Sequence, residues 1–176
     1  MTPEEFKIEL LPLKNKLFRL AWRLTGQREE AEDVVQEVYL KVWDMRHELG
    51  KYRSREGLMV TMTRNRCLDR LRQRKNKALW LKPEIFHRPG EGDLQKHHES
   101  RDLVRQVQKM MEKLPEQQKT IMHLRDVEGY GFEEIAEITG FDGNYIRVNL
   151  SRARKKIREE IIKLENYGTG KSENIA

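Results

Sequence analysis

The chain has 176 residues, of which 36% are charged and 7% aromatic, and it carries a net charge of +6 with a pI near 9.4. So few aromatic residues among so many charges favour small helical units over one large core. The basic balance indicates a polyanionic partner and argues against a small-molecule substrate. Cys67 is the single cysteine, which excludes an internal disulfide and indicates a reducing compartment. No long apolar run or leader peptide is recognisable, so we expect a cytoplasmic protein.

The first part of the chain predicts two helices. Residues 4–25 repeat leucine every three to four positions, with Pro12 as a point of kinking or restart. A polar turn at 27–30 leads into a second helix that runs to Trp43, with its valines inward and its acids at the start, where the helix dipole favours them. Its other face carries Asp33, Gln36, Glu37, Leu40 and Lys41. Capping and solubility explain these acids as well as a protein-contact face does, so both interpretations stay open here.

A loop and a basic helix follow. Residues 46–55 are predicted as a loop that carries Tyr52, and residues 56–77 as a helix. The predicted inward residues of this helix are Leu58, Met62, Leu68 and Leu71. Its second half is basic, with Arg64, Arg66, Arg70, Arg72, Arg74, Lys75 and Lys77 against the single acid Asp69. A solvated face would explain the charge, but Asn65 and Gln73 add groups that can bond base edges.

The pattern dissolves between Ala78 and Arg101, which we interpret as a flexible linker rich in proline and glycine. His97 and His98 lack the cysteines or spaced carboxylates of a metal site, so we expect no metal there. Some of the segment is too apolar for a free tether, namely Trp80, Leu81, Ile85 and Phe86. The ends of a free coil of this length average only about 27 Å apart, so we expect the units that it joins to lie close together.

Two more helices are predicted before the main motif. Residues 102–114 form the first, and Pro115 opens the second, which runs to Val127 and buries Ile121, Met122 and Leu124. A turn over 128–131 follows. At the other end of the chain, residues 166–176 are polar and predicted to be a disordered tail.

Residues 132–157 predict a helix-turn-helix. Gly140 breaks a short first helix, and Asp142 suits the N-cap of a second helix because its carboxylate can accept a backbone amide. The second helix carries one apolar stripe, made of Ile146, Leu150, Ala153 and Ile157. Its outward face is basic, with Arg147, Arg152, Arg154, Lys155, Lys156 and Arg158. An amphipathic hairpin with a basic face is the plainer alternative, but a surface of one sign is typical of phosphate binding, which favours DNA.

The sequence offers no support for an enzyme. It contains no glycine-rich phosphate loop, no nucleophile elbow and no paired His or Cys ligands. Its acids lie at helix starts or on charged faces, and no pattern singles out a catalytic pair. We therefore expect neither catalysis nor a cofactor.

Four blocks together resemble a known family. They are AEDVVQEVYLKVW (31–43), TRNRCLDRLR (63–72), LPEQQK (114–119) and the pair FEEIAEITG with IRVNLSRARKKI (132–157). In this order and spacing they resemble the extracytoplasmic-function sigma factors of bacterial RNA polymerase over roughly residues 6–164. The resemblance implies an all-α fold of two small helical domains: region two at 4–77 and region four at 102–165, joined by the linker 78–101.

The resemblance also implies roles for residues of region two. The helix that contains 31–43 would dock on the clamp helices of the polymerase, with contacts from Asp33, Gln36, Glu37 and Leu40. The basic helix would bind the melted −10 element through Asn65, Asp69, Arg70, Arg72 and Arg74, with a base pocket near Tyr52. A flipped base offers both an edge and a stacking face to such a surface. Leu58 stands where the family often has tryptophan, which we expect to alter the core only.

In region four the resemblance implies contacts with the −35 duplex by Arg125, Arg147 and Arg152, and with phosphates by Lys155 and Lys156. Tyr145, Val148, Asn149 and Ser151 depart from the commoner residues at positions that set base preference. Asn149 has the groups to bond adenine and Arg147 those to bond guanine. The −35 sequence therefore cannot be borrowed from other family members.

The leading prediction is a non-catalytic promoter-specificity subunit whose partners are core RNA polymerase, promoter DNA and an anti-sigma factor. The alternative is a free-standing helix-turn-helix regulator that does not join polymerase. That alternative would leave the helix at 31–43 and the basic helix after it without a role. A more distant third reading is an adaptor that binds only proteins, which the two basic helices argue against.

Overall fold

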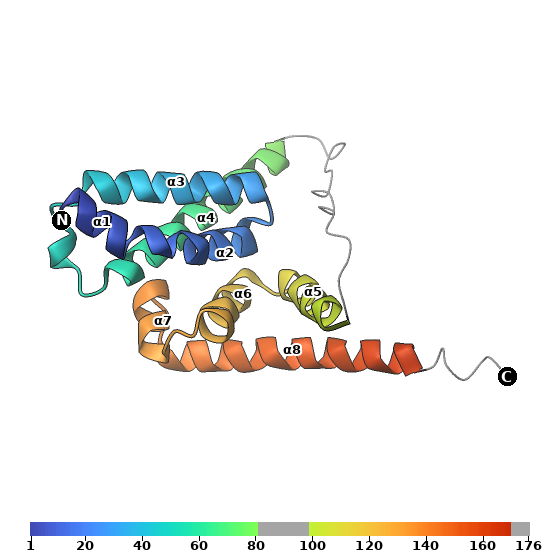
Figure 1. Cartoon of the computed structure of the whole chain (residues 1–176). Helices are drawn as coiled ribbons and strands as arrows, with labels where there is room; N and C mark the ends of the chain where they lie inside the picture. Colours follow the sequence, from blue (N-terminus) through green and yellow to red (C-terminus); the bar gives the residue numbers. More distant parts are fainter. Residues whose placement is uncertain (81–98, 170–176) are drawn as a thin grey trace.

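The structure is a computed structural model, and it describes residues 1–80 and 99–169 (Figure 1). All the regular elements within these ranges are helical, as the sequence predicts. They are α1 (Pro3–Glu9), η1 (Leu11–Leu13), α2 (Lys14–Thr25), α3 (Arg28–Asp44), η2 (Leu49–Lys51), α4 (Arg55–Trp80), α5 (Glu99–Glu112), α6 (Glu116–Met122), η3 (His123–Val127), α7 (Phe132–Thr139) and α8 (Gly143–Thr169). We call α1–α4 the N-terminal unit and α5–α8 the C-terminal unit.

The N-terminal unit packs α2, α3 and α4 around a buried core. Pro12 interrupts the predicted helix over 4–25, which becomes α1, η1 and α2 in succession. Gly26 ends α2 in the left-handed conformation, with φ of 70°, which glycine adopts without a steric penalty. The core is formed by Leu17, Leu20, Ala21, Leu24, Val34, Val35, Val38, Val42, Met59, Val60 and Cys67.

Some element boundaries and faces differ from the sequence predictions. Helix α3 begins at Arg28 inside the predicted turn, and the predicted loop 46–55 contains η2, where Leu49 is 1% exposed. On α4 the core side is centred on Met59, Val60 and Cys67, whereas Leu58 and Met62 are only half-buried. In the sequence these core residues stand among polar and basic residues, so the buried stripe of α4 is difficult to recognise from the sequence alone.

The predicted linker is shorter than expected, because α4 continues to Trp80 and α5 already begins at Glu99. Leu81, Ile85, Phe86 and the two histidines lie outside the described residues. Helix α8 runs to Thr169, so the start of the predicted tail is helical, and residues 170–176 lie outside the described part of the chain.

The C-terminal unit contains the predicted helix-turn-helix. Gly140 ends α7 with φ of 72°, and Asp142 Oδ1 accepts from the amides of Asn144 and Tyr145 at 2.9 Å each, which caps the start of α8. Ile146, Leu150, Ala153 and Ile157 are all buried, which confirms the apolar stripe. The segment after α6 is η3, a stretch of π-helix, and it places His123 and Leu124 in the core.

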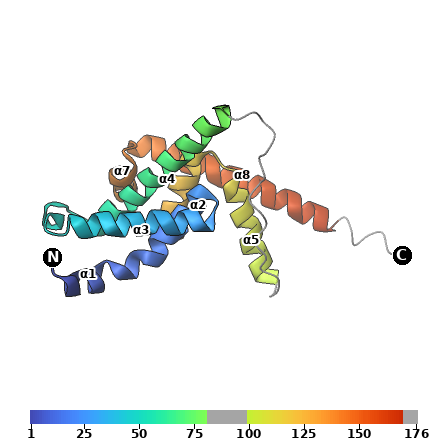
Figure 2. The same ribbon diagram turned by 90° about the horizontal axis from the view of Figure 1, so that it is seen from above.

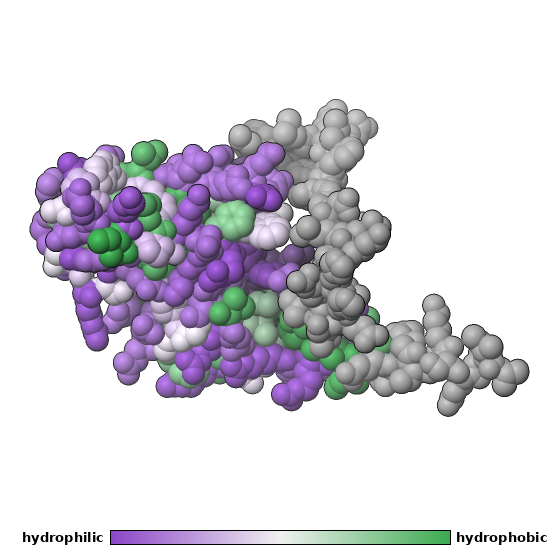
Figure 3. Space-filling view, in the orientation of Figure 1, coloured by the Kyte–Doolittle hydropathy of each residue, from purple (hydrophilic) through white to green (hydrophobic). Residues whose placement is uncertain are grey.

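The two units pack directly against each other. Helix α6 lies against α2, and α7 lies beside α4 (Figures 1 and 2). The face of the molecule seen in Figure 3 is largely hydrophilic, with small separate apolar patches. The functional surfaces must therefore be sought among charged residues and single exposed apolar side chains.

Candidate functional site

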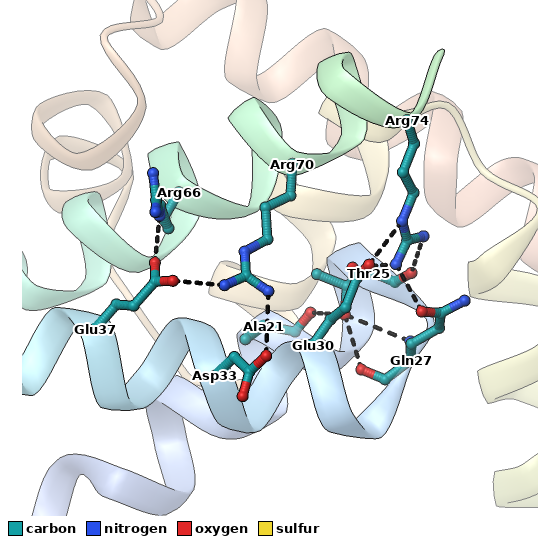
Figure 4. Close-up of polar contacts among 9 residues, drawn as sticks. All are labelled: Ala21, Thr25, Gln27, Glu30, Asp33, Glu37, Arg66, Arg70 and Arg74. Atoms are coloured by element: carbon teal, nitrogen blue, oxygen red, sulfur yellow. Dashed lines mark hydrogen bonds and ion pairs between the residues drawn. The ribbon is translucent and has the colours of Figure 1, made fainter. Parts of the chain in front are cut away.

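The α3 surface, made of Asp33, Gln36, Glu37 and Leu40, is the face where a protein contact was predicted. Gln36 is exposed, and Leu40 has 65% of its surface accessible although it is apolar. Glu37 is engaged within the fold, since it accepts hydrogen bonds from Arg66 Nε and, at 2.6 Å, from Arg70 Nη2 (Figure 4). Asp33 lies 3.6 Å from Arg70 Nη1. Gln36 and Leu40 therefore provide most of the accessible surface of this set.

Helices α3 and α4 border a groove with a volume of about 570 Å³. It is lined by Glu37, Val38, Leu40, Lys41, Asp44, Met62, Asn65, Arg66 and Asp69. Hydrogen bonding from Arg66, together with that from Arg70, lowers the pKa of Glu37 against the opposing effect of burial, so its carboxylate is charged at neutral pH. The groove thus places Glu37 and Leu40 of the α3 surface beside Asn65 and Asp69, which were predicted to bind DNA.

Arg74, which the sequence also assigned to DNA, is instead held inside the N-terminal unit. Its guanidinium donates to the carbonyl of Thr25 at 3.1 Å, to Gln27 Oε1 at 2.9 Å and to Glu30 Oε1 at 2.9 Å (Figure 4). These contacts tie α4 to the turn between α2 and α3. Arg72, two residues earlier, is 74% exposed and contacts only Asp69, at 3.5 Å, among the contacts described for it.

Tyr52 lies apart from the other residues assigned to the −10 element. It lies before α4, is 42% exposed, and lines a cavity of about 370 Å³ between the two units. The wall from the N-terminal unit includes Tyr52, Arg53, Ser54, Gly57, Leu58 and Thr61, and the opposite wall Tyr130, Glu133, Glu134, Glu137 and Ile138. Asn65 and Asp69 line the α3–α4 groove instead, so the structure does not gather the whole predicted set into one cavity.

The predicted −35 residues lie on the C-terminal unit, and three of them, Arg147, Ser151 and Lys155, line a basic groove on α8. Its volume is about 600 Å³, and it is lined by Phe132, Arg147, Leu150, Ser151, Arg154, Lys155, Arg158 and Glu159. Arg147, Ser151, Arg152 and Lys155 are exposed, and Val148 is 38% exposed. We call this the α8 groove. It presents several cations side by side, as binding to a phosphate backbone requires.

Two members of the predicted −35 set face the protein. Asn149 is 7% exposed, and its Nδ2 donates to the carbonyl of Tyr145 at 3.0 Å, so its amide is used within the helix. Tyr145 is half-buried, and its hydroxyl donates to Gln117 Oε1 at 2.9 Å. Its ring lies 4.9 Å from that of Phe141. These contacts favour a structural use of both side chains.

Sequence reasoning missed Phe132 as part of this site. Its ring lies 4.8 Å from the guanidinium carbon of Arg125 and 5.2 Å from that of Arg147. Arg125 Nη1 also donates to the carbonyl of Tyr130 at 2.8 Å. The ring therefore positions two of the predicted DNA contacts through cation–π attraction. The sequence signal was only an aromatic residue at the start of a helix, which is equally typical of a core.

Sequence reasoning also missed that Arg154 forms a bidentate ion pair with Asp126, with Nε–Oδ2 and Nη2–Oδ1 distances of 3.1 and 2.5 Å. The α8 face is thus less uniformly basic than its sequence indicates. A pair between residues on different elements leaves no trace in the periodicity of either one.

Comparisons with known proteins agree with this arrangement. Residues 12–77 match sigma-70 region 2, and residues 104–157 match sigma-70 region 4. The chain is 30% identical over 154 residues to the ECF RNA polymerase sigma factor SigE of Mycolicibacterium smegmatis, an alignment that covers 85% of this chain and 58% of that protein. It is 23% identical to the ECF sigma factor SigW of Bacillus subtilis, with 84% of each chain covered.

The chain thus spans little more than half the length of SigE, but most of the length of SigW. Among solved structures, the fold resembles the sigma factor RpoE from Bartonella quintana, solved in complex with the anti-sigma factor NepR. The TM-score is 0.76 at 23% identity, with 89% of this chain and 96% of that chain covered. With a region 2 and a region 4 in the expected order, the chain belongs to the sigma-70 family, as one of its extracytoplasmic-function sigma factors.

Proposed function

We propose that this chain binds core RNA polymerase and directs promoter-specific initiation, with no catalytic activity of its own, in the cytoplasm. The N-terminal unit would act as region 2, over residues 4–77, and the C-terminal unit as region 4, over residues 102–165. The matches to the two region models, at 12–77 and 104–157, lie within these ranges. The chain would act with core polymerase, promoter DNA and an anti-sigma factor, a class of partner with which RpoE was solved.

One observation carries this proposal: the α3–α4 groove places Leu40, an accessible apolar side chain, beside Asn65 and Asp69 of the basic helix. A regulator that only binds duplex DNA through α8 would have no use for that surface. Accessible apolar residues are typical of the centre of a protein interface, where they are desolvated. Here the groove would join a polymerase contact to a single-strand contact.

The polymerase contact is tested by size-exclusion chromatography of the full chain with core polymerase. Gln36→Lys combined with Leu40→Lys should abolish co-elution, because it replaces the proposed contact surface with two lysines. The fold should be kept, since both side chains are exposed and neither supports the core. Glu37→Lys is a poorer variant, since it would place a lysine against Arg66 and Arg70. Ile8→Lys, at an apolar residue that is 74% exposed on α1, is the matched control. Co-elution of the double variant at wild-type affinity would refute the proposed face.

For the DNA contacts we propose Tyr52, Asn65, Asp69 and Arg72 at the −10 element. Arg70 is left out together with Arg74, because its side chain is 19% exposed and is paired with Asp33 and Glu37. At the −35 element we propose Arg125, Arg147, Val148, Ser151, Arg152 and Lys155. Arg147→Ala should reduce preference at one base pair by roughly 1–3 kcal/mol if its contact is bidentate. Lys155→Ala should instead weaken binding to every duplex alike, because its proposed contact is with phosphate. Equal losses on specific and random duplex for Arg147→Ala would rule out base reading by this residue.

A further inference from the structure

Arg147 lies at the start of α8 without a charged partner. Its guanidinium carbon is 5.2 Å from the centre of the Phe132 ring, and the residue as a whole is exposed. Arg154 of the same groove, by contrast, is paired with Asp126. Among the described side chains, no carboxylate lies within ion-pair distance of Arg147. Its hydrogen-bond donors therefore remain available to a ligand.

Gly143, the first residue of α8, leaves open the space beside this guanidinium. Side chains of a helix lean toward its N-terminus, and residues four positions apart lie on one face, so Arg147 extends back over position 143. A Cβ atom placed on Gly143 would lie 3.2 Å from Nη1 of Arg147 and 3.9 Å from its Cζ. Alanine at this position would move the guanidinium by a few tenths of an ångström, and a larger side chain would displace it.

The backbone gives no other reason for glycine at position 143. Positive φ angles occur at three other glycines of the described chain: Gly26, Gly129 and Gly140. Asp142 already caps the start of the helix, and glycine is less favourable in a helix than alanine. The property that matters at position 143 is thus the missing side chain, because a side chain there would meet Arg147.

Phe132 and Gly143 together form what we call the Arg147 slot. The ring of Phe132 attracts the guanidinium from the start of α7, and Gly143 leaves room for it at the start of α8. A side chain that is already held in place loses less rotamer freedom when it binds. The bidentate contact of arginine with guanine also needs the planar guanidinium in one orientation, since both acceptors lie at the edge of the base.

We propose that Gly143 is a positioning residue that determines −35 specificity through Arg147. Without a side chain at position 143, the guanidinium stays where it can meet the edge of one base pair. With a side chain there, Arg147 turns away and still attracts phosphates, but no longer distinguishes bases. The role in specificity rests on the proposed function, whereas the slot itself can be measured without DNA.

The slot is tested in the full chain by the NMR signal of the Arg147 Nε–H group, which Arg147→Lys identifies by removing it. The ring current of Phe132 should shift this proton away from the position typical of an exposed arginine such as Arg152. Gly143→Ala should reduce the shift slightly and Gly143→Val strongly, and Phe132→Leu should abolish it.

Asn144→Val is the matched control for the slot. It introduces the same side chain at the next position, which is exposed and lies about 100° further round the helix. It should leave the Arg147 signal unchanged, and circular dichroism should show equal helicity in all these variants. An Arg147 signal that is the same in wild type, Gly143→Ala and Gly143→Val would overturn the slot.

Specificity is tested by selecting duplexes from a randomised library with the full chain and sequencing those that bind. Arg147→Ala should flatten the preference at one base pair. Gly143→Val should reduce the preference at the same pair by at least about three-fold, and Gly143→Ala by less. Affinity for a random duplex should change less than about two-fold, because the cation is kept. Asn144→Val should keep the wild-type preference.

The two variants should also depend on each other. Once Arg147→Ala is present, adding Gly143→Val should have no further effect at this base pair, since the guanidinium that it displaces is gone. A preference that Arg147→Ala removes and Gly143→Val retains would overturn the inference. Failure of the proposed base contact would look different, because Arg147→Ala would then leave every preference intact while the NMR signal still responds to Gly143→Val. That result would refute the role of Gly143 in specificity and leave the slot as a feature of the fold.

Discussion

Replacing Arg74 with alanine separates a structural role from a DNA-binding role on α4. The family resemblance places Arg74 among the −10 contacts, yet its guanidinium bonds the Thr25 carbonyl, Gln27 Oε1 and the Glu30 carboxylate. Its side chain is 34% exposed and that of Glu30 is 25% exposed. Arg74→Ala should therefore lower stability rather than remove a contact with DNA.

The magnitude follows from these contacts. A net hydrogen bond that involves a charged group contributes about 1.5–3 kcal/mol, and breaking a fully buried ion pair from one side costs about 3–5 kcal/mol. Both side chains keep some contact with water, which reduces the loss. We expect Arg74→Ala to lower the free energy of unfolding by about 2–3 kcal/mol.

Urea unfolding of the full chain, followed by circular dichroism, measures this loss. Arg72→Ala is the control on the same helix, because Arg72 is 74% exposed, and its stability should stay within about 0.5 kcal/mol of wild type. Promoter binding by the polymerase complex should instead be weakened by Arg72→Ala more than by Arg74→Ala. The reasoning is wrong if Arg74→Ala leaves stability unchanged and weakens promoter binding as much as Arg72→Ala does.

Three further outcomes are expected. Burial lowers the pKa of His123, so the free energy of unfolding should be highest above about pH 6.5 and fall as the pH drops below that value, with a further loss from Glu128 only below about pH 4.5. Urea titrations at a series of pH values should give wild type and His123→Gln different slopes of this free energy against pH, and identical slopes would contradict the prediction. Burial raises the pKa of Cys67 to about 12, so Ellman's reagent should react with it only in urea, and rapid reaction of the native chain would contradict the fold. Phe132→Leu should weaken duplex binding about two- to five-fold, since it removes the ring face beneath Arg147, and unchanged binding would exclude the positioning role.

The helix-turn-helix was predictable because its determinants are local. Gly140, Asp142 and the apolar stripe from Ile146 to Ile157 lie within one short stretch, and the structure confirms the turn, the cap and the buried face. Residues that act on neighbours a few positions away leave a pattern in the sequence. The all-α fold and the order of the helices follow from the same kind of signal.

The placement of single polar side chains was not predictable in this way. Asn149 and Arg74 were both predicted to contact DNA, but each is engaged by a carbonyl or carboxylate of the protein. Arg19 and Glu128 are 109 positions apart, and neither flanking sequence marks them as partners. Their pairing depends on how the two units pack against each other, a property that helical periodicity does not encode.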